Sequence, residues 1–161
     1  MKKIVIIISL GTLLLSCGEN SEKKKGFEYN RTQKTEKKDN QSIDSSVSVD
    51  LSNKGIGPIT SLTLEKRIDN KMAETGATLF KQKCTACHLA DKKLIGPPMV
   101  GILERRSPEW IMNIMLNPTE MLEKDPIAKE LLKAYNNVIM LNQNLSKEEA
   151  RSLLEYFRTL E

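Results

Sequence analysis

The sequence predicts an all-α domain of four to five helices over residues 66–161. Apolar residues there recur at the 3.6-residue period of an amphipathic helix, and polar residues followed by proline mark helix starts. A third observation is that no segment of this region alternates strictly between apolar and polar residues, as a strand would. The formal net charge of +4 is a mild basic excess, which does not suggest nucleic-acid binding.

Two of the predicted helices begin at a polar cap followed by proline, which is tolerated at the first helical position because no N–H is needed there. The two pairs are Ser107 with Pro108 and Asp125 with Pro126. The first of these helices is expected to run to about Leu116, because Pro118 follows it. The pattern of the second continues to Tyr135.

The first and last helices of the domain are predicted to cross. Gly76 and Phe80 stand one turn apart on one face of a helix before Cys84, and the glycine permits close approach by another helix. A capping box of Ser146 and Glu149 opens the C-terminal helix, which we expect to be that partner. Its apolar face consists of Ala150, Leu153, Leu154, Phe157 and Leu160.

The residues with the most distinctive chemistry form a C-x-x-C-H motif of Cys84, Cys87 and His88. This pattern is typical of c-type haem attachment. Two thiols with this spacing add to the two vinyl groups on one side of a porphyrin, and the next residue places its imidazole under the iron. The sequence therefore predicts one covalent haem c, with His88 as an iron ligand.

The motif has two other possible interpretations. A structural zinc site needs four nitrogen or sulfur ligands, and the domain offers two thiols and one imidazole. A thioredoxin-like dithiol begins a helix beside a strand, and no strand pattern precedes Cys84. Both interpretations account for the motif less well than haem does.

The wider pattern resembles the class I monohaem c-type cytochromes. Gly76, Phe80 and the motif together read G-x3-F-x3-C-x-x-C-H, similar to the N-terminal helix of that family, and Tyr156 with Phe157 resembles its aromatic pair. The resemblance covers about 95 residues. It implies the class I cytochrome c fold and an electron-transfer protein rather than an enzyme.

The resemblance also implies roles for residues that follow the motif. The segment from Ile95 to Gly101 is similar to the family's G-P-x-L-x-G turn, so the carbonyl of Pro97 is expected to accept the Nδ1–H of His88. Arg105, Arg106 and Trp110 could meet the haem propionates. Surface charge for the arginines and plain core packing for the tryptophan are the alternatives.

His88 is the only histidine, so bis-histidine ligation within one chain is impossible, which leaves methionine, a weaker ligand or an open position. Met140 precedes the C-terminal helix, which is where the family places its methionine ligand, although Leu141 replaces the proline that often follows it. Met121 is the second candidate. Position or helical packing argues against the remaining methionines, which are Met72, Met99, Met112 and Met115.

The N-terminus is predicted to be a bacterial lipoprotein address. Residues 1–16 combine a basic start with an apolar run too short to span a bilayer, as a signal peptide does. The run ends at Ser16 and Cys17, which resembles a lipobox with Cys17 as the lipidated residue. An ordinary cleaved signal with a chance cysteine is the alternative. Residues 17–65 are predicted to be a lipidated N-terminus and a mostly disordered tether.

The sequence thus predicts a monomeric electron carrier, lipid-anchored on the periplasmic side of a bacterial membrane. Its expected partners are redox proteins: a quinol-oxidising complex or other donor, and a terminal reductase or oxidase. The domain is also similar to small cytochromes that accompany nitrous-oxide respiration in Bacteroidetes-type bacteria. A haem sensor or peroxidase-like protein with a displaceable sixth ligand is the alternative, and a fixed oxidase subunit is a third.

Overall fold

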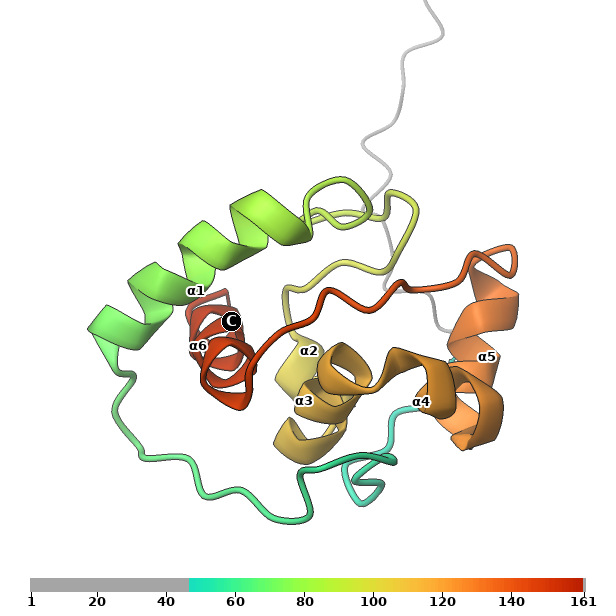
Figure 1. Ribbon diagram of the computed structural model, residues 1–161, viewed down its shortest axis with the longest axis horizontal. Coiled ribbons are helices and arrows are strands. Elements are labelled where there is room, and N and C mark those ends of the chain that lie inside the picture. Colours follow the sequence, from blue (N-terminus) through green and yellow to red (C-terminus); the bar gives the residue numbers. More distant parts are fainter. Residues whose placement is uncertain (1–46, 161) are drawn as a thin grey trace, which may run out of the picture. The chain divides into compact units, whose positions relative to one another are not determined.

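The computed structural model describes residues 47–160, which form six α-helices and, within that range, no strand. The helices are α1 (Asn70–Lys83), α2 (Ile102–Arg105), α3 (Pro108–Leu116), α4 (Pro118–Lys124), α5 (Pro126–Ala134) and α6 (Lys147–Arg158). In Figure 1, α1 and α6 lie on one side of the domain, α4 and α5 on the other, and α2 and α3 between them. The all-α prediction is confirmed. The predicted signal peptide and Cys17 lie outside the described residues.

The helices expected from the sequence begin where their caps indicate. Ser107 caps α3 by accepting a hydrogen bond from the backbone N–H of Trp110, and Asp125 caps α5 through Ala128. Ser146 opens α6 with both bonds of the capping box. These side chains satisfy N–H groups that have no partner inside the helix, so they fix each helix start.

Two short helices were missed at the sequence level. Helix α2 is a single turn that follows Gly101 in the left-handed conformation, and it is too short to show a period. Helix α4 begins at Pro118, for which the sequence pattern predicts only the end of α3. A proline ends the preceding helix but fits the first position of the next one, so Pro118 does both.

Helices α1 and α6 cross at Gly76, and theirs is the most extensive helix–helix contact in the described domain. A Cβ at Gly76 would overlap the carbonyl oxygen of Ser152 and lie 2.9 Å from the Cβ of Tyr156. One turn further along α1, the Phe80 ring lies 5.5 Å from that of Tyr156 and 5.9 Å, edge-on, from that of Phe157. The expected crossing and its aromatic contacts are therefore present.

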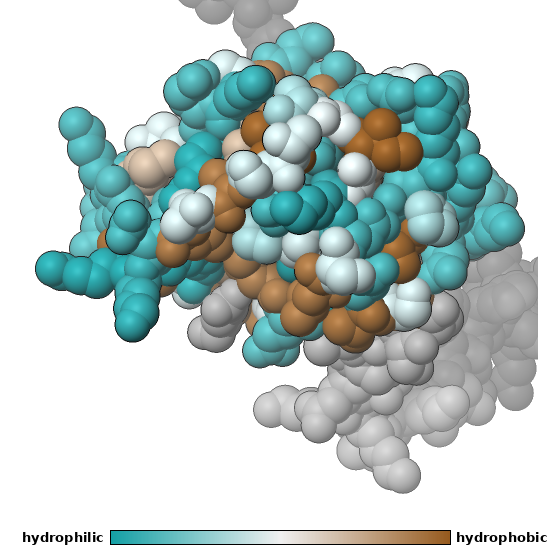
Figure 2. Space-filling model, turned by 90° about the horizontal axis from the view of Figure 1, so that it is seen from below, coloured by the Kyte–Doolittle hydropathy of each residue, from teal (hydrophilic) through white to brown (hydrophobic). Residues whose placement is uncertain are grey.

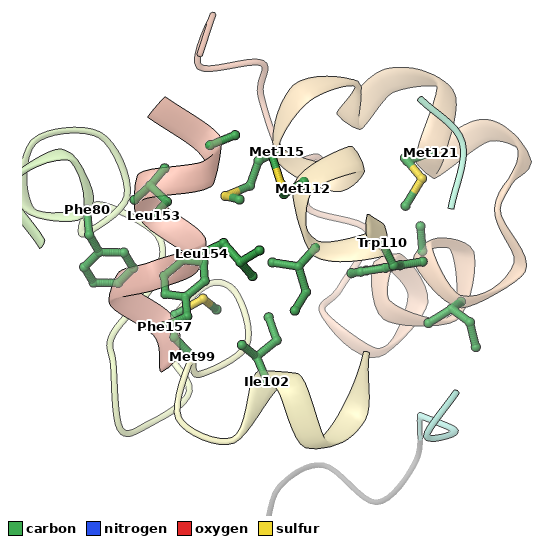
Figure 3. Packing of buried hydrophobic residues seen from close by; sticks show 14 residues of the cluster. Phe80, Met99, Ile102, Trp110, Met112, Met115, Met121, Leu153, Leu154 and Phe157 are labelled. Carbon is green, nitrogen blue, oxygen red and sulfur yellow. The ribbon is translucent and has the colours of Figure 1, made fainter. Parts of the chain in front are cut away.

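A single apolar core joins the helices (Figure 3). Leu153 and Leu154 of α6 are completely buried against side chains from α1 and α3, and Trp110 of α3 is 2% exposed. No helix among residues 47–160 is both long enough and apolar enough to cross a membrane. The core thus depends on the faces of α1 and α6 that the sequence pattern predicts.

The prediction that the tether extends to residue 65 is wrong for its last part. Ile56, Ile59 and Leu62 pack against the core. The segment before α1 runs along the lower edge of the domain in Figure 1. Seen from that side, apolar side chains lie in patches between hydrophilic ones (Figure 2). The segment is polar on average, so its sequence alone does not predict that its few apolar residues pack on the core.

Buried Asn113 fixes this segment to α3. Its Nδ2 donates to the carbonyls of Lys54 (2.9 Å) and Ile59 (2.8 Å), and its Oδ1 accepts from the N–H of Ile59 (3.0 Å). These bonds satisfy backbone groups that a loop would otherwise leave unpaired against the core. Residues 54–59 therefore belong to the folded domain.

Replacing Gly76 with alanine should destabilise the domain by on the order of 3 kcal/mol. Alanine favours a helix by about 1 kcal/mol over glycine, but the overlap with a backbone carbonyl outweighs this gain. Guanidinium unfolding followed by the fluorescence of Trp110, the only tryptophan, measures the change. The control is Thr78→Ala on the exposed face of α1, which should leave stability nearly unchanged. Equal stability of the two variants would contradict the close crossing.

The variant Asn113→Ala tests whether residues 53–60 belong to the folded domain. Losing three hydrogen bonds to backbone groups should lower the free energy of unfolding by about 2–3 kcal/mol. The control, Thr60→Ala, alters an exposed side chain of the same segment and should have little effect. If the segment were a loose tether, both variants would match the wild type in the same unfolding assay.

Candidate haem site

The motif and the predicted methionine line one cavity of about 350 Å³. Its wall comes from the end of α1, residues 84–102, α3, α5 and the loop between α5 and α6. Most of the lining is aliphatic or aromatic, including Phe80, Ile102, Trp110, Ile111 and Phe157. Such a volume and lining suit a flat apolar ligand.

The two motif cysteines sit in a turn that continues directly from α1. The N–H of Cys84 donates to the carbonyl of Phe80 at 2.9 Å, and the carbonyl of Cys84 accepts from the N–H groups of Cys87 (3.1 Å) and His88 (2.9 Å). This turn brings both thiols and the imidazole to the same cavity wall. Burial raises the pKa of the Cys84 thiol to about 11, whereas Cys87 is exposed.

His88 is held by the turn that follows the motif. Its Nδ1 lies 2.9 Å from the carbonyl oxygen of Pro97, as the family resemblance requires. Burial lowers the pKa of His88, and the hydrogen bond to Pro97 opposes that shift. A carbonyl partner places the proton on Nδ1, which leaves Nε2 as the nitrogen with a free lone pair.

Gly96 lies against the face of this imidazole. A Cβ there would overlap Cε1 of His88 and lie 2.7 Å from Nδ1. The N–H of Gly96 also donates to the carbonyl of Cys87 at 2.8 Å, which closes the loop back onto the motif. Two contacts therefore fix the imidazole ring of His88. The carbonyl of Pro97 bonds to Nδ1, and Gly96 packs against the ring.

Arg105 braces the same loop, a role that sequence analysis missed. Its Nη1 donates to the carbonyl of Val100 at 2.9 Å and its Nη2 to that of Pro98 at 3.0 Å. The guanidinium fork matches two carbonyls of the loop that carries Pro97. Only its position just after a glycine–proline turn could have signalled this role.

Met140 lines the cavity from the loop between α5 and α6, half-buried against the core. No proline follows Met140, and polar contacts restrain the loop instead. The Nζ of Lys83 reaches the carbonyl of Gln143 at 3.4 Å, and the Nε2 of Gln143 donates to the carbonyl of Leu141 at 3.2 Å. Lys83 ends α1, so the methionine loop is connected to the helix that carries the cysteines.

Met121 does not belong to the site. It is fully buried in α4, where its Sδ accepts the N–H of Ile56 at 2.9 Å, and it does not line the cavity. Figure 3 shows it beyond Trp110, beside the N-terminal segment. Met99 and Met115 do line the cavity, and both are buried in the apolar core. Among the cavity-lining methionines, only Met140 lies in a loop with a partly exposed side chain.

Trp110 and Arg106 contribute differently to the wall. The indole Nε1 of Trp110 donates to buried Asp125 at 3.0 Å, so its N–H is engaged away from any propionate. Arg106 is 4% exposed and lies over the Trp110 ring, 5.5 Å from its centre. Neither Arg105 nor Arg106 forms an ion pair within residues 47–160. Two half-buried or buried guanidinium groups on one cavity wall suit an anionic group of a ligand.

The family of the chain follows from its similarity to known proteins. The cytochrome c family model matches residues 73–161, more than half of the chain. The chain belongs to the cytochrome c family. A cytochrome c from Rhodothermus marinus is 41% identical, with a TM-score of 0.62 over 65% of this chain and 89% of that one. Among curated proteins, none matches.

Engineered forms of the Rhodothermus marinus protein are also similar to this chain. Rma TDE is 40% identical with a TM-score of 0.62, covering 65% of this chain and 90% of that one. The same engineered protein bound to a carbene intermediate, 1-ethoxy-1-oxopropan-2-ylidene, is 41% identical with a TM-score of 0.60 and covers 65% and 89% of the two chains. Carbene binding is a property of the engineered cytochrome.

The residues present fit the cofactor of this family, one covalent haem c with its iron. The cavity is apolar, as a porphyrin face requires, and Cys84 and Cys87 are the thiols of its C-x-x-C-H motif. Within residues 47–160 no three His, Cys, Asp or Glu side chains gather as a metal site, so the zinc interpretation lacks ligands. No strand accompanies the cysteines in this range either, which disfavours a thioredoxin-like dithiol.

Gly96→Ala should disturb the His88 side of the haem, because the added methyl group overlaps the imidazole. We expect a lower ratio of haem to protein absorbance after maturation, together with a shifted Soret band in the fraction that retains haem. Gly57→Ala is the matched control: its methyl group presses on Asn113, away from the cavity, and should lower stability without moving the band. Identical spectra for wild type and Gly96→Ala would contradict this geometry.

Proposed function

We propose that the protein is an extracytoplasmic electron carrier that uses one haem c with His88 and Met140 as axial ligands. The observation that supports this most directly is that the two side chains line one apolar cavity from two separate loops. When bound, the haem would supply a one-electron Fe(II)/Fe(III) couple, and ligation by a thioether and an imidazole would raise its potential. Every other contribution comes from the chain.

The chain's first contribution is to exclude water and to hold the ligands still. The lining of the cavity is mostly apolar, and Pro97 and Gly96 fix the orientation of His88. Lys83 connects the Met140 loop to α1. A site whose ligands are fixed in both oxidation states needs little rearrangement, which suits rapid electron exchange.

The rim of the cavity suits contact with another protein. Exposed apolar side chains line its edge: Ile95 is 44% exposed, Val138 50%, Ile139 63% and Leu141 71%. Bound haem would cover part of this apolar surface, and the part that stays exposed at its edge would suit an interaction site. Docking there would bring a redox partner to the edge of the cofactor, across a dry contact.

The lipoprotein signal of residues 1–16 and the lipid at Cys17 belong to this proposal as its positional part. A lipid-anchored monomer on the periplasmic side of the membrane would sample both a quinol-oxidising complex or other donor and a terminal reductase or oxidase. The resemblance to cytochromes of nitrous-oxide respiration supports a reductase as the acceptor. Ile56, Ile59 and Leu62 pack against the core, so this part of the predicted tether belongs to the folded domain.

Met140→Ala tests the ligation and, with it, the choice of function. The oxidised wild type should be low-spin with the weak long-wavelength band of methionine–iron(III) coordination, and its reduced form should not bind carbon monoxide readily. The variant should lose the band, become high-spin and bind carbon monoxide, because a coordination position opens. Absorption spectra and a one-electron voltammetric wave measure these properties.

Met121→Leu is the control for this experiment, because Met121 is buried outside the cavity and should not affect the spectrum. Persistence of the band in Met140→Ala would disprove the ligand assignment. A wild type that is high-spin, or that binds carbon monoxide when reduced, would instead support a haem sensor or peroxidase-like protein.

A further inference from the structure

Arg106 is a buried positive charge that forms no ion pair among the described residues, although the charges of Glu130, Asp125 and Asp50 act on it. It is 4% exposed and lines the cavity, and none of the ion pairs in residues 47–160 includes it. Its Nη1 donates to two backbone carbonyls, those of Ser48 at 2.7 Å and Arg105 at 2.6 Å. Burial lowers the pKa of Arg106 and the neighbouring charge of Arg105 adds to that shift, while the carboxylates of Glu130, Asp125 and Asp50 oppose it.

The segment of residues 47–50, here called the strap, covers this arginine. The strap accepts a hydrogen bond from Arg106 through the Ser48 carbonyl. It also donates the N–H of Asp50 to the carbonyl of Arg105 at 3.1 Å, so that Asp50 and Arg106 form an isolated β-bridge. Val47 helps to line a second cavity of about 30 Å³ that shares Arg105 and Arg106 with the larger one. The strap therefore contacts the arginine side of the haem cavity through Val47, Ser48 and Asp50.

The carboxylate of Asp50 holds the strap in shape. Its Oδ1 accepts from the N–H and the Oγ of Ser52, both at 2.8 Å, and from the N–H of Asn53 at 3.0 Å. This turn fixes the chain immediately after Ser48. Asp50 does not line either cavity, so a change there acts on the cofactor only through the strap or through its own charge.

We propose that the strap is a positioning element that holds Arg106 in a water-poor place beside the haem and thereby raises the reduction potential. The inference rests on the proposed electron carrier. Reduction adds one negative charge to the haem, so a nearby fixed positive charge favours the reduced form. That field is strong while the guanidinium is shielded from water and weak once it is solvated. Releasing the strap should therefore lower the potential.

Two substitutions at Asp50 separate this effect from simple loss of charge. Asp50→Asn keeps the oxygen that forms the turn and removes one negative charge, so the potential of the full-length holoprotein should rise slightly. Asp50→Ala removes the same charge but also breaks the turn, and its potential should fall below that of the wild type. Voltammetry measures both, and faster hydrogen exchange of the amides of residues 48–53 reports release of the strap.

A rise in both variants, with faster exchange in Asp50→Ala, would overturn the proposal. If exchange is unchanged in that variant, Val47→Gly with Asp50→Ala removes the apolar contact as well, and the same outcomes apply. In an Arg106→Gln background, Asp50→Ala should raise the potential as Asp50→Asn does, because the charge on which the strap acts is gone.

If Arg106→Gln fails to mature, Arg106→Lys takes its place as the background. Lysine keeps the charge without the two carbonyl bonds, so the fall caused by Asp50→Ala should become smaller. A fall of undiminished size would overturn the role of Arg106. A low-spin methionine-ligated spectrum in all variants shows that the electron carrier itself is intact, which separates a failure of this inference from a failure of the proposed function.

Discussion

Helices α1 and α6 approach so closely at Gly76 that one added methyl group would overlap the backbone of the partner helix. Both halves of the haem site depend on this contact. Helix α1 ends in the turn that presents Cys84 and His88, while the loop with Met140 leads into α6. Rings from the two helices meet beside the crossing and contribute to the cavity wall. A crossing with a wider separation would move the thiols and the thioether apart, and the cavity between them would lose its apolar lining.

Polar side chains hold the loops that line the apolar cavity. Arg105 binds two carbonyls of the loop that carries Pro97, and Lys83 binds a carbonyl of the loop that carries Met140. In each case a long side chain satisfies loop carbonyls that have no helix or sheet partner. The cofactor thus meets a mostly hydrocarbon surface while the loops that form it are fixed by hydrogen bonds. These hydrogen bonds restrain a loop that has no proline after its methionine.

The N-terminal segment is fixed by the same means. Buried Asp125 starts α5 and accepts Trp110 Nε1–H at 3.0 Å through Oδ1, and its Oδ2 accepts Asn53 Nδ2–H at 2.7 Å. One carboxylate therefore joins a helix start, the wall of the haem cavity and the segment before α1. Because a buried carboxylate is stable only when its oxygens are bonded, the three elements depend on one another. The strap of residues 47–50 extends this connection to Arg106.

The sequence by itself determined the helical class, the helix starts at Ser107, Asp125 and Ser146, and the covalent attachment motif, because caps and short motifs act between residues a few positions apart. It did not reveal α4, since a proline that ends one helix and begins the next looks the same in either role. Only the tertiary structure decided that residues 47–65 belong to the domain and that Met121 lies outside the site. Those outcomes depend on contacts between residues more than fifty positions apart, such as Asn113 with Ile59, and no local pattern encodes such contacts.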